Sequence, residues 1–230
     1  MIKIEHTDVY GWEAAIRGMR NPMNSWADSD SYCGCNEGRC GECGVNGCNR
    51  GFGNWVVGEK DLKLMQNLIK PGTGDHRKYL RYITVTVDFE APLYWWKEFD
   101  TYRIGVTPDP ADIEMNSCST MHKIHSKKFE IDDFSHEKMS IHMKTCLENV
   151  IFCLNCAREM YLETKDKQHW WNMIQLLPTS YNQRRTVKLN YEVLRNIYFA
   201  RKNHKLDEWR KVCKWIESLP YAKELICWEG

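Results

Sequence analysis

The most regular alternation of apolar and polar positions lies between Leu80 and Phe89. Branched apolar side chains at 83, 85 and 87 are separated by threonines at 84 and 86. This period of two, in a segment rich in β-branched residues, predicts a half-buried strand. Pro92 suits the first turn of a helix, which we expect to run through an aromatic segment to Arg103.

The longest apolar repeat predicts a helix from Ser135 to Thr164, with Ser135 as its N-cap. The repeat has spacings of four and three and consists of Met139, Met143, Cys146, Val150, Cys153, Ala157 and Met160. Such a stripe packs lengthwise against another helix, either within the subunit or between subunits. Cys153 and Cys156 form a C-x2-C pair, and the place of Cys153 on the stripe favours a buried apolar role over metal binding.

Other periodic segments predict shorter helices. These are Asp8 to Met19, Glu59 to Lys70, Lys167 to Leu177, Asn190 to Arg201 and Leu206 to Leu219. Val106 to Glu114 is expected to be a loop. Helices mixed with one clear strand indicate an α/β (α+β) fold, with one mostly antiparallel sheet flanked by helices. The length of 230 residues suits a single domain over residues 1–230.

Charge and hydropathy exclude several classes of protein. The chain has 32 Lys and Arg against 31 Asp and Glu, a net charge of +1, which argues against generic nucleic-acid binding. No apolar run approaches the roughly 20 residues of a membrane span. The first residues lack a basic and then apolar signal, so we expect a cytoplasmic protein.

Residues 32–53 differ from the rest of the chain, because they hold five Cys and seven Gly with almost no aliphatic side chains. We interpret them as an inserted loop. The five cysteines are Cys33, Cys35, Cys40, Cys43 and Cys48. Four thiolates can close a tetrahedral zinc site, and the inner C-x4-C-x2-C spacing also matches an iron–sulfur cluster of the plant ferredoxin type. A surface insertion without metal is the third possibility.

A second group of polar residues surrounds the aromatic helix. His76 precedes the strand, Lys97, Thr101 and Arg103 end the helix, and a hydroxyl-rich segment from Asn116 to His122 follows. Cations, hydroxyls and aromatic rings together suit a phosphorylated planar ligand. A structured polar loop is the alternative interpretation.

The order of these segments resembles the flavin-dependent thymidylate synthases (the ThyX family), which convert dUMP to dTMP with FAD, NADPH and methylenetetrahydrofolate. Trp12 to Arg17 is similar to the family's N-terminal helix, and Ala91-Pro92 to the end of its strand. Lys97 to Arg103 stands where the family has RQxxRHR. It keeps the final Arg and has Lys97 for the first.

Two later segments are also similar. Asn116 to His122 stands in place of NExSxRY and keeps the Asn and Ser119, whereas the Arg-Tyr pair is Met121-His122. Near the C-terminus the similar positions are Leu177-Pro178, Tyr181, Asn190 to Leu194 for NARSL, Arg201, and Glu208 to Arg210 for the EIR segment. Glu192 replaces the Arg of NARSL, which in the family helps to hold the pyrimidine nucleotide.

The resemblance implies a flavin or nucleotide ligand, with FAD as cofactor, and a homo-oligomer, a homotetramer in the family. The ligand-binding residues that it implies, together with the polar group above, are His76, Lys97, Thr101, Arg103, Asn116, Ser119, His122, Asn190 and Arg201. His122 is the candidate catalytic acid or base. The reversed charge at Glu192 argues against thymidylate synthesis.

Three hypotheses for function therefore stay open. The first is an enzyme acting on another pyrimidine nucleotide, and the second is a non-catalytic protein of phage or mobile-element origin that binds or sequesters a nucleotide. The third is a metal-stabilised structural or interaction protein. The fold of a protein does not by itself determine which of these three functions it has.

Overall fold

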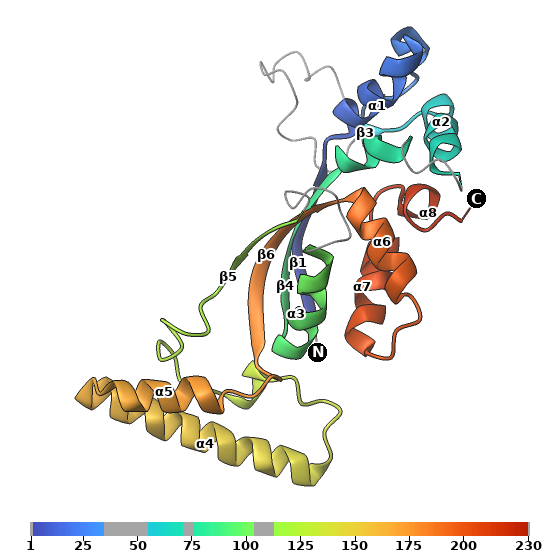
Figure 1. Ribbon diagram of the computed structural model, residues 1–230. Coiled ribbons are helices and arrows are strands. Elements are labelled where there is room, and N and C mark those ends of the chain that lie inside the picture. The colour runs from blue at the N-terminus through green and yellow to red at the C-terminus, as the bar shows by residue number, and fades with distance from the viewer. Residues whose placement is uncertain (1, 35–54, 71–75, 104–112, 230) are drawn as a thin grey trace. The chain divides into compact units, whose positions relative to one another are not determined.

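The computed structural model describes residues 2–34, 55–70, 76–103 and 113–229 (Figure 1). The strands are β1 (Lys3–Tyr10), β2 (Tyr32–Cys33), β3 (Trp55–Val56), β4 (Thr84–Pro92), β5 (Glu114–Ser117) and β6 (Asn182–Asn190). The helices are α1 (Trp12–Arg20), α2 (Glu59–Ile69), α3 (Leu93–Phe99), α4 (Ile141–Thr164), α5 (Lys167–Leu176), α6 (Tyr191–Arg201), α7 (Asp207–Glu217) and α8 (Ala222–Leu225). Short 3-10 turns include Arg77–Arg81 and Asp100–Arg103.

Four strands form the main sheet in the order β1-β4-β6-β5. β4 alternates as its sequence predicts, with Val85, Val87 and Phe89 buried. β2 and β3 form a separate antiparallel pair. The expected α/β (α+β) class is therefore confirmed.

The chain divides into two compact units. Among the described residues, the first unit holds 2–4, 88–101 and 115–186, and the second holds the remainder. Each strand of the main sheet has residues in both units. A single domain over 1–230 stays a prediction.

The first unit has an aromatic core on α3 and a second core between α4 and α5. Trp95 stacks on Phe99 with ring centroids 5.1 Å apart, and the indole N–H of Trp96 donates to the Gln183 carbonyl at 3.0 Å. α4 and α5 run side by side (Figure 1). Their shared core is built on Leu154 and Met173, both fully buried. Apolar burial of this kind supplies most of the stabilisation of a helix pair.

In the second unit, the core lies among α1, α2, α6 and α7. Trp12 of α1 makes edge contacts with Tyr191 and Tyr221, and the Tyr191 hydroxyl donates to the Pro220 carbonyl at 2.6 Å. Trp209 of α7 is fully buried. Trp12, Tyr191 and Trp209 are thus core residues, whereas Trp26 and Tyr82 of the same unit are exposed.

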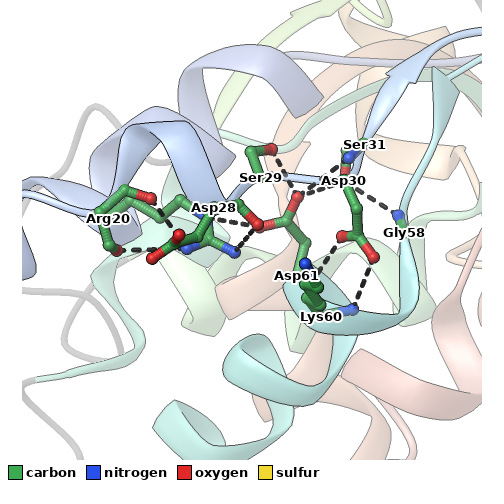
Figure 2. Close-up of polar contacts among 9 residues, drawn as sticks. Arg20, Asp28, Ser29, Asp30, Ser31, Gly58, Lys60 and Asp61 are labelled. Atoms are coloured by element: carbon green, nitrogen blue, oxygen red, sulfur yellow. Dashed lines mark hydrogen bonds and ion pairs between the residues drawn. The ribbon is translucent and has the colours of Figure 1, made fainter.

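A buried ion pair joins α1 to α2 in the second unit (Figure 2). Arg20 Nε lies 2.6 Å from Asp61 Oδ1, and the hydroxyls of Ser29 and Ser31 donate to Asp61 Oδ2 at 2.6 Å. Burial raises the pKa of Asp61, but the hydroxyl donors and Arg20 outweigh it, so the pKa is lowered. The carboxylate is thereby held ionised inside the protein.

Asp30 caps α2 from outside the helix. Its carboxylate accepts the backbone N–H groups of Lys60 at 2.9 Å and Asp61 at 3.1 Å (Figure 2). These donors at the first turn have no partner within the helix, and the Lys60 N–H lowers the pKa of Asp30 most. A Cβ on Gly58 would lie 2.2 Å from the Asp30 carboxyl carbon. Only glycine fits this approach.

The structure corrects three predicted boundaries. Asp8 begins no helix, because residues 8–10 belong to β1 and the helix starts after Gly11, whose φ of 95° favours glycine. The strand expected from Leu80 begins at Thr84, because Leu80 lies in a 3-10 turn. Glu114 is not part of a loop, since it begins β5.

The long helix was expected from Ser135 but begins at Ile141. The backbone N–H of Ser135 donates to the Ser180 carbonyl at 2.8 Å, and the preceding Phe134 pairs with Tyr181. Ser135 is thus held in an extended segment, and Ser140 takes the N-cap position.

The buried face of α4 was also predicted wrongly. Leu147, Ile151 and Leu154 are its buried residues. From the predicted stripe, Met143, Cys146, Cys153 and Met160 are exposed. The interpretation of Cys153 as a core residue is therefore wrong, and its neighbour Cys156 is exposed as well. α4 has two apolar faces, and periodicity alone does not say which of them meets α5.

Candidate functional site

An ion pair with a buried carboxylate lies at the N-terminus of α6 in the second unit. Glu192, in the first turn, is buried and its Oε1 accepts a hydrogen bond from Arg77 Nε at 2.9 Å. The side chain of Glu192 is 10% exposed and that of Arg77 is 29% exposed. The other carboxylate oxygen, Oε2, is buried with no partner among the described residues.

Arg195 extends this arrangement one turn along α6. Its guanidinium Nη1 donates to the carbonyls of Ile226 and Trp228, both at 2.8 Å, and the guanidinium lies 4.7 Å from the centre of the Phe199 ring. Burial lowers the pKa of Arg195, and the charge of Arg77 lowers it further. Arg195 thus anchors the segment after α8.

Arg201 ends α6 beside two aromatic rings. Its Nε donates to the Tyr102 hydroxyl at 2.6 Å, and its guanidinium lies 4.9 Å from the centre of the Trp209 ring. This is a cation–π contact on a buried indole. The side chain of Arg201, one of the predicted ligand-binding residues, therefore already makes contacts within the protein.

In the first unit, Arg185 on β6 is the centre of a polar network. It lies over Trp96 at 4.2 Å, pairs with Asp100 at 2.8 Å, and donates to Gln183 at 3.0 Å. Gln183 in turn donates to the Cys118 carbonyl at 2.8 Å. The network fixes the segment that follows β5 to β6.

The nine predicted ligand-binding residues fall in both units. Lys97, Thr101, Asn116, Ser119 and His122 belong to the first unit, and His76, Arg103, Asn190 and Arg201 to the second. His76, Lys97, Asn116 and His122 are exposed. The side chain of Arg103 lies outside the described residues.

Three of these residues make local structural contacts. The buried Asn190 is the N-cap of α6, since its Oδ1 accepts the Val193 N–H at 3.0 Å. Thr101 donates to the Glu98 carbonyl at 2.6 Å. Ser119 accepts the N–H of Met121 at 3.3 Å, which caps the turn before His122. A hydroxyl or amide used in this way stabilises local structure first.

Of the predicted metal ligands, only Cys33 is described, half-buried in β2. Cys35, Cys40, Cys43 and Cys48 lie outside the described residues. Within the part of the chain that is described, no three His, Cys, Asp or Glu side chains are arranged to hold a metal ion.

The predicted ligand-binding residues do not include Arg77, Arg185 and Arg195. Arg77 directly follows the predicted His76, and the reversed charge at Glu192 is a signal that a basic partner is required. Nothing in the sequence pairs Arg185 with Asp100, which lies 85 residues away. Contacts of that range depend on the fold.

Comparison with solved structures gives the class of fold. The chain is similar to the flavin-dependent thymidylate synthase ThyX from Helicobacter pylori complexed with FAD and dUMP, with a TM-score of 0.62 and 15% identity, over 98% of this chain and 97% of that one. A second structure of thymidylate synthase X from Helicobacter pylori, also with FAD and dUMP, has a TM-score of 0.60 and 15% identity, over 98% and 96%. Protein-family models and curated proteins give no match.

These similarities confirm the fold that the resemblance implied. The chain has the ThyX fold over nearly its whole length, at 15% identity to those structures. Within the described residues, none of the helices is both long and apolar enough to cross a membrane.

Proposed function

We propose that the chain is a nucleotide- or flavin-binding protein on the ThyX fold that does not synthesise thymidylate and acts on another pyrimidine nucleotide. The fold supports the ligand class, because both similar structures are complexes with FAD and dUMP. The observation that carries the exclusion of thymidylate synthesis is the ion pair of Glu192 with Arg77.

Glu192 stands where the resemblance implies an Arg that holds the nucleotide. A buried carboxylate at this position neutralises Arg77 and repels a phosphate or a polarised carbonyl oxygen. Its Oε2, which is buried and has no hydrogen-bond partner within the described part of the chain, can accept a hydrogen bond but cannot donate one.

The exposed members of the predicted set support binding of an anionic planar ligand. Within the first unit, Lys97 supplies a positive charge, and Asn116 and His122 supply hydrogen-bonding groups that solvent can reach. Asn190 and Thr101 already hydrogen-bond within the protein. A flavin, when bound, would supply hydride transfer, and Lys97 is the residue best suited to its diphosphate.

Binding without turnover is the second candidate. His122, the proposed acid or base, is exposed on the turn after β5. A non-catalytic protein of phage or mobile-element origin would need the binding residues but no fixed general base.

A metal in residues 32–53 remains a separate proposal. Zinc or an iron–sulfur cluster held by Cys33, Cys35, Cys40, Cys43 and Cys48 would give a structural or interaction role. The resemblance further leads us to propose a homo-oligomer.

The first test is an absorbance spectrum of anaerobically purified protein, before and after acid denaturation, followed by calorimetry with FAD and with dUMP. We expect flavin or nucleotide binding, and no dTMP in the presence of dUMP, FAD, NADPH and methylenetetrahydrofolate. Formation of dTMP would overturn the exclusion of thymidylate synthesis. Absence of binding to FAD and to every pyrimidine nucleotide tested would overturn the proposal as a whole.

The role of Glu192 is tested by two variants. Glu192→Arg reverses the charge, and the isosteric Glu192→Gln removes it. If the carboxylate repels phosphate, both variants bind dUMP more tightly than the parent chain. Equal dUMP affinity in all three proteins would contradict this role, and circular dichroism establishes that each variant is folded.

A further inference from the structure

Two cysteines of α4 line a groove between α4 and α5. The groove has a volume of about 640 Å³, and its walls include Cys153 and Cys156 from α4 and His169 from α5. Both thiols are free and exposed. Cys153 is thus not a core residue, and the C-x2-C pair is open to a ligand that arrives from solvent.

A third sulfur lines the same groove. Met160 is 45% exposed and follows Cys156 by four residues, just as Cys156 follows Cys153 by three. Side chains at these spacings lie on one face of a helix, with neighbouring Cβ atoms about 5–6 Å apart. Two thiols and one thioether therefore reach the groove from successive turns of α4.

This spacing allows the two thiols to share one metal ion. Two sulfurs on one ion lie at most about 4.6 Å apart, which is twice a metal–sulfur distance of about 2.3 Å. Thiols whose Cβ atoms are about 5–6 Å apart reach that separation by turning toward each other. Because Cys153 and Cys156 are exposed, their rotamers can change without repacking the core.

The kind of donor selects the metal. Thiolate and thioether sulfurs are soft ligands, and the thioether in particular favours Cu(I). A structural zinc ion takes four ligands, whereas no three His, Cys, Asp or Glu side chains in the described ranges are arranged to hold a metal ion. His169 therefore does not complete a zinc site with the two cysteines. Cu(I), a soft ion that accepts a low coordination number, fits the three sulfurs.

We propose that Cys153, Cys156 and Met160 form a Cu(I) site on α4. On binding, each thiol releases its proton to solvent and each thiolate forms a copper–sulfur bond, while the thioether of Met160 binds as a neutral third ligand. Copper enters and stays as Cu(I), so no electron is transferred. The site lies within the first unit, whereas Cys33 belongs to the second, and it does not depend on the ligand of the proposed function.

Protection from alkylation tests the site one cysteine at a time. The reduced full chain is equilibrated without oxygen in Cu(I) solutions buffered by bicinchoninate and treated with iodoacetamide, and tandem mass spectrometry locates the modified cysteines. We expect Cys153 and Cys156 to become protected together, while the exposed Cys146, outside the groove, stays reactive. Alkylation of Cys153 and Cys156 as fast as of Cys146 in all the Cu(I) buffers would overturn the site.

Stoichiometry tests the two thiolates. The double variant Cys153→Ser with Cys156→Ser is compared with Cys146→Ser, which removes an exposed thiol of the same helix. All three positions are exposed, so both variants are expected to fold, and circular dichroism checks this. The double variant should bind one Cu(I) fewer than the parent chain, and Cys146→Ser as many. Residues 32–53 are the same in all three proteins, so equal stoichiometry of the double variant and the parent chain would overturn the site.

The thioether is tested by Met160→Leu, which keeps the size of the side chain and removes the sulfur. Met143, another exposed methionine of α4, gives the matched control Met143→Leu. Losing even an outer partner of a metal ligand weakens a metal site about 10–100-fold, so we expect Met160→Leu to weaken Cu(I) binding at least about tenfold. Met143→Leu should leave it unchanged. Equal Cu(I) affinity in both variants and the parent chain would overturn the three-sulfur site.

Discussion

At the scale of single residues, Asp61 shows how a buried charge is made tolerable. Both oxygens of its carboxylate are hydrogen-bonded, one to Arg20 and the other to the hydroxyls of Ser29 and Ser31. Such a pair adds little beyond an apolar contact of the same size, but removing one partner leaves an uncompensated charge. The site is therefore sensitive to substitution.

We expect Asp61→Asn to lower the free energy of unfolding by about 3–5 kcal/mol, because Arg20 would stay buried without its counter-charge. Urea denaturation measures this. Asp28→Asn, at a neighbouring exposed carboxyl, is the matched control and is expected to change stability little. Equal effects of the two substitutions would contradict the account.

The same carboxyl makes stability depend on pH. Its pKa is lower in the folded protein than the roughly 3.9 of an unfolded chain, so its contribution is present above that value and is lost as pH falls through the folded pKa. We expect unfolding free energy to decline below about pH 4 in the parent chain and to decline less steeply in Asp61→Asn.

Residue identity suggests candidates for a binding site but does not fix the role of each one. Asn190 is expected to bind ligand, and its side chain also caps α6. Asn is among the best N-cap residues, and the sequence does not say which use prevails. The ion pair of Glu192 with Arg77 joins residues 115 positions apart, which only the fold brings together.

At the scale of elements, periodicity predicted α4 but not its buried face. Leu147, Ile151 and Leu154 also recur at four and three, parallel to the stripe that starts at Met143. Both patterns are helical, and burial depends on where α5 lies. The strands β1 and β5 were missed because their sequences, KIEHTDVY and EMNS, have no clear apolar alternation.

A matched pair of leucines on α4 tests this assignment. Leu154 is fully buried and Leu162 is 39% exposed. We expect Leu154→Ala to cost about 2–5 kcal/mol of unfolding free energy and Leu162→Ala to stay within about 0.5 kcal/mol. Thermal melts at one protein concentration compare them, and similar losses would show that the buried face is assigned wrongly.

At the scale of the whole molecule, the order of segments carried enough information to give the fold. A strand ending in Ala91-Pro92, an aromatic helix and the later helices kept their sequence order, although identity to the similar structures is 15%. The pattern of buried positions is kept when individual residues change, because many sequences are compatible with one arrangement of apolar faces. The strand order β1-β4-β6-β5 needs long-range pairing, which local patterns do not contain.

The pairing of β2 with β3 leads to a prediction for the Cys-rich segment. Cys33 lies opposite Trp55, so Asn-Gly in place of residues 34–54 would join the strands by a two-residue hairpin turn. Compared with the parent chain after treatment with a metal chelator, we expect the shortened chain to fold with equal or higher unfolding free energy, because a shorter loop costs less entropy to close. Urea denaturation checks this, and a chain that no longer folds would contradict it.

The close spacing of the two strand ends also bears on the history and use of this protein. Because Cys33 and Trp55 are neighbours in space, the distance between the two strand ends does not fix the length of the chain that connects them. Genetic events can therefore lengthen, exchange or delete the intervening codons while selection on the scaffold continues undisturbed. The same position offers an insertion point for an epitope or a fluorescent reporter.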